Sequence, residues 1–249
     1  MHKPVFAANW KMNHGPRAAA AFMHAFLAQF AAADDRTVIF FPPALTLCTL
    51  VHATRNRPDI ILGVQNIHWE NRGAFTGENS APIAREAGAS VALVGHSERR
   101  HLFGETEDQT AEKCAAAADA GLVPMLCVGE RLEERDRNAT QSVVLRQVKA
   151  GLSRLQPEQI ATMAIAYEPV WAIGTGKTAR PEDATGVHTV IRGALHESIG
   201  AEAVDVPILY GGSVTVETAP ALLRSPEVDG LLVGGASLDA TGWTAIVRT

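Results

Sequence analysis

The stretch SVALVGHSERR (residues 90–100) contains the pattern that decides the fold. An apolar run of strand length lies near residues 90–94, Gly95 follows it, and polar residues typical of a helix start come next. The run is continuously apolar and does not alternate with polar residues, as expected for a strand buried on both faces of a parallel sheet. The stretch therefore predicts a buried parallel strand that leads into a helix.

The same kind of run recurs along the whole chain about every 30 residues, the length of one strand-and-helix unit. Helical stretches lie between the runs, and the clearest begins at Pro16 with an aromatic stripe of Phe22, Phe26 and Phe30 that we interpret as core packing. Another begins at Pro181 and ends at Gly200. The other seven apolar runs lie near residues 5–9, 37–41, 60–64, 122–127, 163–167, 206–210 and 229–234.

Eight such units predict an α/β fold: a single (β/α)8 barrel domain over residues 1–249, with eight parallel strands and an outer ring of helices. A doubly wound open sheet of eight strands is the alternative. We expect one domain because no linker rich in proline, glycine or serine divides the chain.

Composition excludes several classes of protein. The chain has 249 residues, 47% hydrophobic and 20% charged, so it can bury a large core without a membrane. The net charge of −5 is spread along the sequence, which argues against nucleic-acid and membrane partners. The three cysteines lack CxxC spacing, and the apolar run after Met1 is too short for a signal peptide. We therefore expect a cytoplasmic protein.

Unusual polar residues follow several of the predicted strands. In a (β/α)8 barrel the loops after the strands build the active site, so these residues should meet at one mouth. They stand in the segments NWKMN (9–13), GHSERR (95–100), EP (168–169), GGS (211–213) and GG (234–235).

The glycine pairs after the last two strands predict a phosphate site. Each pair is expected to run into a short helix, where backbone N–H groups at the positive helix end bind phosphate. Ordinary tight turns are the alternative for either pair alone. Two pairs on adjacent strands, Gly211-Gly212 and Gly234-Gly235, favour a phosphate monoester as the ligand.

Glu168 is the candidate general base because its carboxylate should leave a strand end facing the mouth. Exclusion of water would disfavour the charged form and raise the pKa of this carboxyl. The alternative is a structural salt bridge with Arg100. His96 stands at a helix start that should keep its ring neutral, as a donor to a carbonyl oxygen, although a structural role is the alternative. Lys11 supplies positive charge near Asn9, and the histidines show no metal-ligand spacing.

These residues together resemble the triosephosphate isomerase family, and the resemblance spans nearly the whole chain. Six segments carry it, in order along the chain. They are NWKMN (9–13), GAFTGE (73–78), GHSERR (95–100), YEPVWAIGTGK (167–177), YGGSV (210–214) and LVGGASL (232–238).

The resemblance implies interconversion of dihydroxyacetone phosphate and glyceraldehyde 3-phosphate through an enediolate, as in glycolysis and gluconeogenesis, without metal or organic cofactor. It implies that Glu168 moves the proton, that His96 polarises the carbonyl as a neutral electrophile, and that Lys11, which should contact Glu98, stabilises negative charge with Asn9. It also implies a lid over residues 169–179. The residues it assigns to the substrate are Asn9, Lys11, Gly174, Ser213, Gly234 and Gly235.

The resemblance further implies a homodimer through the loop that begins at Gly73 and ends at Glu78, with Phe75 exposed and Thr76 reaching toward the partner's active site. The sequence departs from the family's usual residues at Asn79, Arg180 and Thr218. The change at Arg180 removes a common helix cap and could cost about 1 kcal/mol locally.

Two other functions remain open from the sequence. One is a different (β/α)8 enzyme acting on a phosphorylated sugar, which would have no reason to combine Lys11, His96 and Glu168. The other is a catalytically silent barrel that binds a sugar phosphate, which would need neither a base nor a lid. Turnover separates these alternatives from an isomerase.

Overall fold

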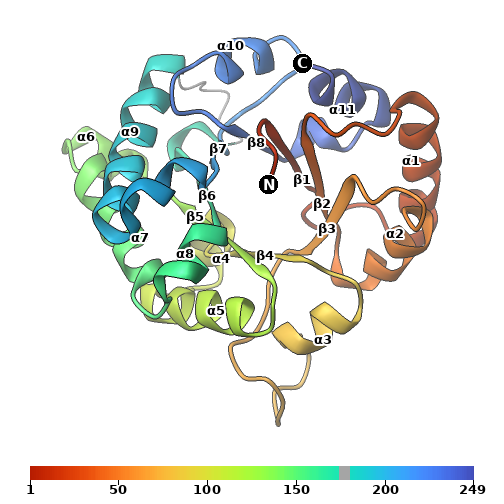
Figure 1. Ribbon diagram of the computed structural model, residues 1–249, viewed down its shortest axis with the longest axis horizontal. Coiled ribbons are helices and arrows are strands. Elements are labelled where there is room, and N and C mark those ends of the chain that lie inside the picture. The colour runs from red at the N-terminus through yellow and green to blue at the C-terminus, as the bar shows by residue number, and fades with distance from the viewer. Residues whose placement is uncertain (174–179) are drawn as a thin grey trace.

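The computed structural model describes residues 1–173 and 180–249 and shows eight parallel strands closed into a barrel inside a ring of helices (Figure 1). The strands pair in sequence order, and β1 also pairs with β8, where Val5 lies opposite Gly230. That pairing confirms the closed barrel and excludes the doubly wound open sheet. The strands are β1 (Val5–Asn9), β2 (Thr37–Phe41), β3 (Ile60–Val64), β4 (Val91–Val94), β5 (Val123–Val128), β6 (Ala164–Tyr167), β7 (Ile208–Tyr210) and β8 (Gly230–Val233).

Helices connect successive strands, and none in the described ranges is long and apolar enough to cross a membrane. The α-helices are α1 (Pro16–Gln29), α2 (Leu47–Ala53), α3 (Ala81–Glu86), α4 (Ser97–Leu102), α5 (Glu107–Asp119), α6 (Leu132–Asp136), α7 (Thr140–Leu152), α8 (Pro157–Thr162), α9 (Pro181–Ile199), α10 (Ala219–Leu223) and α11 (Ala240–Val247). The 3-10 helices are η1 (Ala44–Thr46), η2 (Val170–Ala172), η3 (Gly200–Asp205) and η4 (Gly235–Ser237).

The strands are buried on both faces, which explains why their sequences are continuously apolar. In β1, Val5 and Ala7 belong to a smaller core cluster of strand residues, whereas Phe6 and Ala8 belong to a larger cluster that includes the helices. Alternate side chains of one strand therefore fill the barrel and support the helical layer. This double burial fixes the strand ends, and with them the site.

The two helices expected from the clearest sequence signals are present. Helix α1 begins at Pro16, and its buried Phe22 and Phe26 confirm the core stripe, while Phe30 lies just past the helix end and is also buried. Helix α9 begins at Pro181 and ends before Gly200, whose φ of +65° is a left-handed conformation that glycine adopts at low cost.

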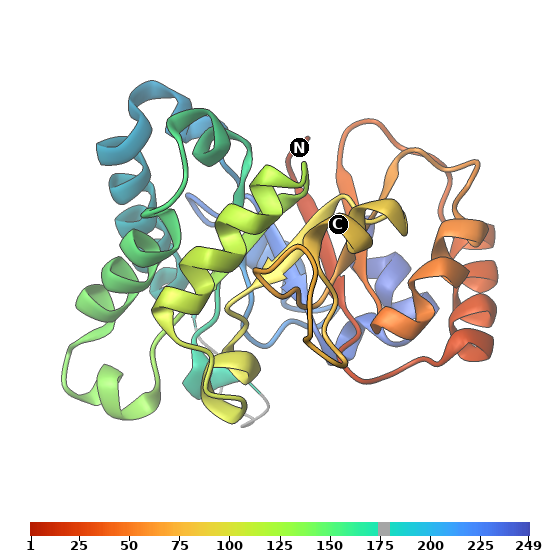
Figure 2. The ribbon, with the colours of Figure 1, turned by 90° about the horizontal axis from the view of Figure 1, so that it is seen from below.

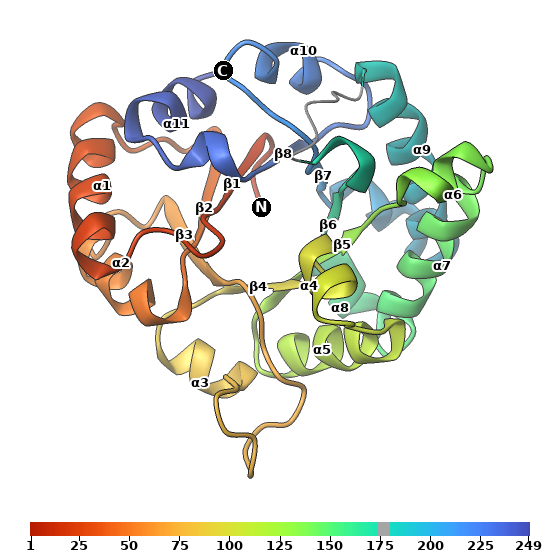
Figure 3. The same cartoon turned by 180° about the vertical axis from the view of Figure 1, so that it is seen from behind.

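The two ends of the barrel differ. The N-terminus lies at one end (Figure 2), and the opposite end carries the connections that leave the carboxyl ends of the strands, including α4 (Figure 3). Between β3 and α3 a long loop projects away from the barrel in both axial views. An isolated bridge between His68 and Ser80 closes the base of this loop.

Candidate active site

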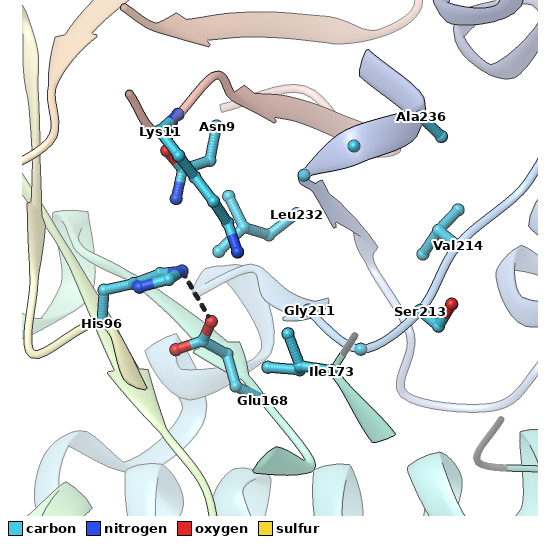
Figure 4. Close-up of a pocket in the computed structure, with 13 residues that line it drawn as sticks. Asn9, Lys11, His96, Glu168, Ile173, Gly211, Ser213, Val214, Leu232 and Ala236 are labelled. Carbon is cyan, nitrogen blue, oxygen red and sulfur yellow. Dashed lines mark hydrogen bonds and ion pairs between the residues drawn. The ribbon is translucent and has the colours of Figure 1, made fainter. Parts of the chain in front are cut away.

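Seven of the eight residues predicted for the site line one cavity of about 290 Å³ at the carboxyl ends of the strands (Figure 4). The eighth, Gly174, lies outside the described residues. The same holds for residues 175–179, the other part of the expected lid (169–179) that is not described. His96 and Glu168 face each other on one side, with Ser213 on the far side (Figure 4). The seven are Asn9, Lys11, His96, Glu168, Ser213, Gly234 and Gly235.

His96 and Glu168 form a buried pair. His96 directly precedes α4 and Glu168 directly follows β6, and Nε2 of His96 lies 2.9 Å from Oε1 of Glu168. The backbone N–H of Glu98 donates to Nδ1 of His96 over 3.3 Å. Because Nδ1 accepts a hydrogen bond, the ring hydrogen of the neutral tautomer lies on Nε2, facing the carboxylate.

The pKa of Glu168 is lowered, and the expectation of a raised value is wrong for this arrangement. Burial alone would raise it, but His96 and the backbone N–H of Ser97, which donates to Oε2 over 2.8 Å, outweigh burial. A carboxylate that accepts such bonds stays ionised. Desolvation therefore does not decide the pKa of this carboxyl here.

The pKa of His96 is raised, against the expectation from the helix start alone. Burial, the largest single influence, lowers it, but the Glu168 carboxylate outweighs burial. The N–H of Glu98, at the start of α4, fixes the tautomer of the neutral ring, although the pKa is raised. The pKa shift and the tautomer therefore have separate causes.

Lys11 reaches the cavity from the segment after β1. Its Nζ lies 2.7 Å from Oε1 of Glu98, which confirms the contact that the resemblance implied. Asn9 accepts the backbone N–H of Lys11 with its Oδ1 over 3.0 Å. Figure 4 shows the amide nitrogen of Asn9 facing the same cavity as Lys11 and His96.

The glycine turns line the cavity, but only one of them runs into a helix. Gly234 leads directly into η4, as expected. The pair Gly211 and Gly212 is followed by irregular chain up to α10, so the helix expected there is wrong. The absence of a side chain still has a function at Gly211, because a Cβ there would lie 3.0 Å from Cγ of Glu168.

The alternative salt bridge between Glu168 and Arg100 is not formed. Arg100 instead donates to the carbonyl oxygens of Gly95 over 2.7 Å and Cys127 over 3.0 Å. Arg100 therefore links the end of β4 to the end of β5, and Glu168 pairs with His96 instead. Among residues 1–173 and 180–249, no arginine side chain pairs with this carboxylate.

Several residues that the sequence did not indicate support the site. Ser97 holds Glu168 with its backbone N–H. Glu130 is fully buried and accepts hydrogen bonds from Tyr167 Oη and from Nε1 of Trp171, the latter over 2.8 Å. Arg135 stacks over the Trp171 ring at 4.2 Å. A glutamate two residues after the end of the apolar strand β5 was the available signal for Glu130.

The three departures from the family's usual residues have local consequences. The side chain of Arg180 does not cap α9, but Asp183 accepts the Arg180 N–H over 3.1 Å and replaces part of the cap. Thr218 exchanges hydrogen bonds with Thr215 before α10. Asn79 accepts the backbone N–H of His68 with its carbonyl oxygen. None of the three lines the cavity.

A buried acid–base pair beside a cation, at the carboxyl ends of a closed parallel barrel, places this chain among the (β/α)8-barrel enzymes. The sequence model of the triosephosphate isomerase family matches residues 4–249. The chain belongs to that family.

Individual relatives agree along the full length. The chain is 45% identical to a triosephosphate isomerase of Solibacter usitatus, over 100% of both chains. It is 46% identical to that of Carboxydothermus hydrogenoformans, over 100% of this chain and 99% of the relative. A crystal structure of triosephosphate isomerase from Bartonella henselae superposes with a TM-score of 0.89 at 36% identity, covering 99% of this chain and 98% of that one.

Proposed function

We propose that this chain interconverts dihydroxyacetone phosphate and D-glyceraldehyde 3-phosphate through an enediolate, using Glu168, His96 and Lys11. The observation that carries the proposal is their convergence on one cavity of about 290 Å³, opposite Ser213. That volume is at the small end of ligand sites and suits a three-carbon phosphate. Family membership supports the same reaction.

Glu168 is the proposed base. It takes a proton from one substrate carbon, and the electron pair moves toward the carbonyl oxygen to give the enediolate. A proton then passes from the hydroxyl oxygen to the former carbonyl oxygen, and the same carboxyl returns its proton to the neighbouring carbon, so that the carbonyl forms on the first carbon. Glu168 is 2% exposed and its carboxyl is ionised, so it is ready to accept a proton at neutral pH. To contact the substrate, the Glu168 carboxylate must give up its hydrogen bonds to Ser97 and His96.

His96 is the proposed donor to the developing oxyanion. Its Nε2 carries the hydrogen in the neutral tautomer and faces the cavity beside Glu168. The main influence that raises the pKa of His96 is Glu168 itself, whereas burial and Lys11 lower it. When Glu168 turns to the substrate, that raising influence weakens and the ring is held neutral.

Substrate charge is assigned to groups around the rest of the cavity. Lys11 lies close to the second glycine turn, where a Cβ on Gly234 would stand 3.3 Å from its Cε. Ser213, Gly234 and Gly235 can place backbone N–H groups against a phosphate without a side chain in the way at the glycines. The side-chain amide of Asn9 donates a hydrogen bond to a substrate oxygen. Gly174 is the last of the proposed substrate-binding residues.

A homodimer is the proposed assembly, and an apolar surface supports it. Large apolar side chains are exposed after four successive strands, with Met12 at 95% and Leu45 at 90%, which is costly on a monomer. Phe75, in the projecting loop between β3 and α3, packs on His68 and is still 43% exposed. The second copy would cover this face, which comprises Met12, Leu45, Phe75, Ile83 and Leu102.

We also propose a domain organisation, the absence of a cofactor and a cytoplasmic location for this chain. Residues 1–249 form one barrel domain that acts without metal or organic cofactor. Cys48, Cys114 and Cys127 are free thiols, which fits a cytoplasmic protein.

The deciding experiment measures isomerisation of glyceraldehyde 3-phosphate by purified protein in EDTA, coupled to a dehydrogenase, beside Glu168→Gln. Fast turnover that falls by several decades in the variant supports the reaction and its base. Equal rates would point to a contaminant or a different base. Binding of a sugar phosphate without turnover would support the silent barrel instead.

A further inference from the structure

The backbone of Lys11 adopts a conformation that lysine rarely takes. Its φ is +50°, in the left-handed region that side chains other than glycine seldom occupy. The direction of the side chain depends on this φ, because rotation to a negative value would move Cβ and redirect Nζ away from Glu98. Something must hold the peptide groups on both sides of Lys11.

Asn9 holds only one of those two groups. Its Oδ1 accepts the Lys11 N–H, which fixes the peptide before the residue. The carbonyl oxygen of Lys11 lies in the peptide after it. Within the described part of the chain, the one hydrogen bond to this oxygen comes from Gln65, at 2.8 Å.

Gln65 directly follows β3 and uses one amide group for two carbonyls. Its Nε2 donates to Lys11 O and to Phe41 O, each over 2.8 Å. An amide nitrogen has two hydrogens, so both are used here. Phe41 O also accepts the N–H of Trp10 over 3.2 Å, so the amide ties the segment after β1 to the end of β2.

We propose that Gln65 is a positioning residue that aims Lys11 at the substrate by holding its carbonyl in the left-handed conformation. The inference rests on the proposed function of Lys11. Gln65 does not line the cavity, so it acts through Lys11 and not on the substrate. Its loss releases the Lys11 peptide to relax, and Nζ leaves both Glu98 and the cavity.

A double-mutant cycle tests the proposal. Gln65→Met keeps the length of the side chain and removes both donors, and it is measured with Lys11 intact and in Lys11→Met. We expect Gln65→Met to lower kcat/KM by up to about a hundredfold, with a higher KM, when Lys11 is present. In the Lys11→Met background, the added Gln65→Met substitution should change kcat/KM by less than twofold, because the lysine side chain that Gln65 positions is absent. An equal loss in both backgrounds, or no loss in either, would overturn the proposal.

Two controls keep the result interpretable. Gln29→Met removes an amide that donates to Ala25 O on α1, far from the site, and should leave kcat/KM unchanged. Gln65→Glu, which has the same shape but only acceptors when ionised, replaces Gln65→Met if the latter does not fold.

A readout without turnover separates this proposal from the proposed function. The rate at which an amine reagent modifies Lys11, followed by mass spectrometry, should rise in Gln65→Met as Nζ leaves Glu98. Absent turnover in the wild type refutes the isomerase, whereas an unchanged labelling rate refutes the role of Gln65.

Discussion

Nε2 of His96 lies 2.9 Å from Oε1 of Glu168, and both side chains are almost completely buried. The two residues are far apart along the chain: Ser97, the neighbour of His96, and Glu168 are 71 positions apart. The contact joins the end of β4 to the end of β6. It places the proposed donor and the proposed base within one hydrogen bond of each other.

Replacing His96 with Gln should lower kcat by about two to three decades, because a fixed donor at a developing oxyanion is lost. Steady-state kinetics with the coupled assay measures the effect. His24→Gln, an exposed site on α1, is the matched control and should behave as wild type. A kcat within twofold of wild type for His96→Gln would remove His96 from the mechanism.

His188 should make the protein less stable as the pH falls. Burial lowers the pKa of this residue to about 4, and its Nδ1 bonds to the carbonyl oxygen of Glu227. The lowered pKa means that its stabilising contribution is complete above the unfolded value of about 6.5 and is lost as the pH falls toward 4. The loss amounts to about 3 kcal/mol of unfolding free energy.

Denaturant unfolding of wild type and His188→Phe between pH 7 and pH 4 checks this prediction. The variant should show a shallower decline over that range. Parallel curves for the two proteins would mean that His188 does not titrate as proposed.

Gly211→Ala should reduce kcat on the order of tenfold while the barrel stays folded. The new Cβ would lie 3.0 Å from Cγ of Glu168 and 3.2 Å from the carbonyl oxygen of Tyr167, so the base is displaced by a few tenths of an ångström. Kinetics and thermal unfolding are measured together. A normal kcat would show that the site absorbs the methyl group.

Gly193→Ala provides the matched glycine control. A Cβ at this exposed position of α9 would meet nothing within 4 Å. It should leave kcat unchanged and raise the free energy of unfolding by about 1 kcal/mol, because alanine favours a helix over glycine.

Leu45→Glu should weaken the proposed dimer. Leu45 is 90% exposed, and a carboxylate there would have to be buried against the second copy. Sedimentation at micromolar concentration should show a shift toward particles of 26.5 kDa. Val204→Glu, at a 59% exposed position in η3, should leave the assembly unchanged. A wild type that sediments only as a monomer would refute the dimer itself.

The sequence by itself determined the barrel and most of the cavity. Apolar runs such as VFAAN at residues 5–9 must be buried on both faces, which defines a strand from local information alone. Because the carboxyl ends of parallel strands meet at one end of the barrel, polar residues placed there, such as Lys11 and Glu168, converge without further knowledge.

Only the tertiary structure decided how those residues are held. The lowered pKa of Glu168 depends on His96 and on an N–H from Ser97, and the carbonyl oxygen of the left-handed Lys11 accepts an amide hydrogen from Gln65, 54 residues away. Hydrogen bonds and charge interactions change over a few tenths of an ångström to a few ångströms between residues far apart in sequence. Strand periodicity fixes which residues reach the site, but these distances exist only after the barrel has closed.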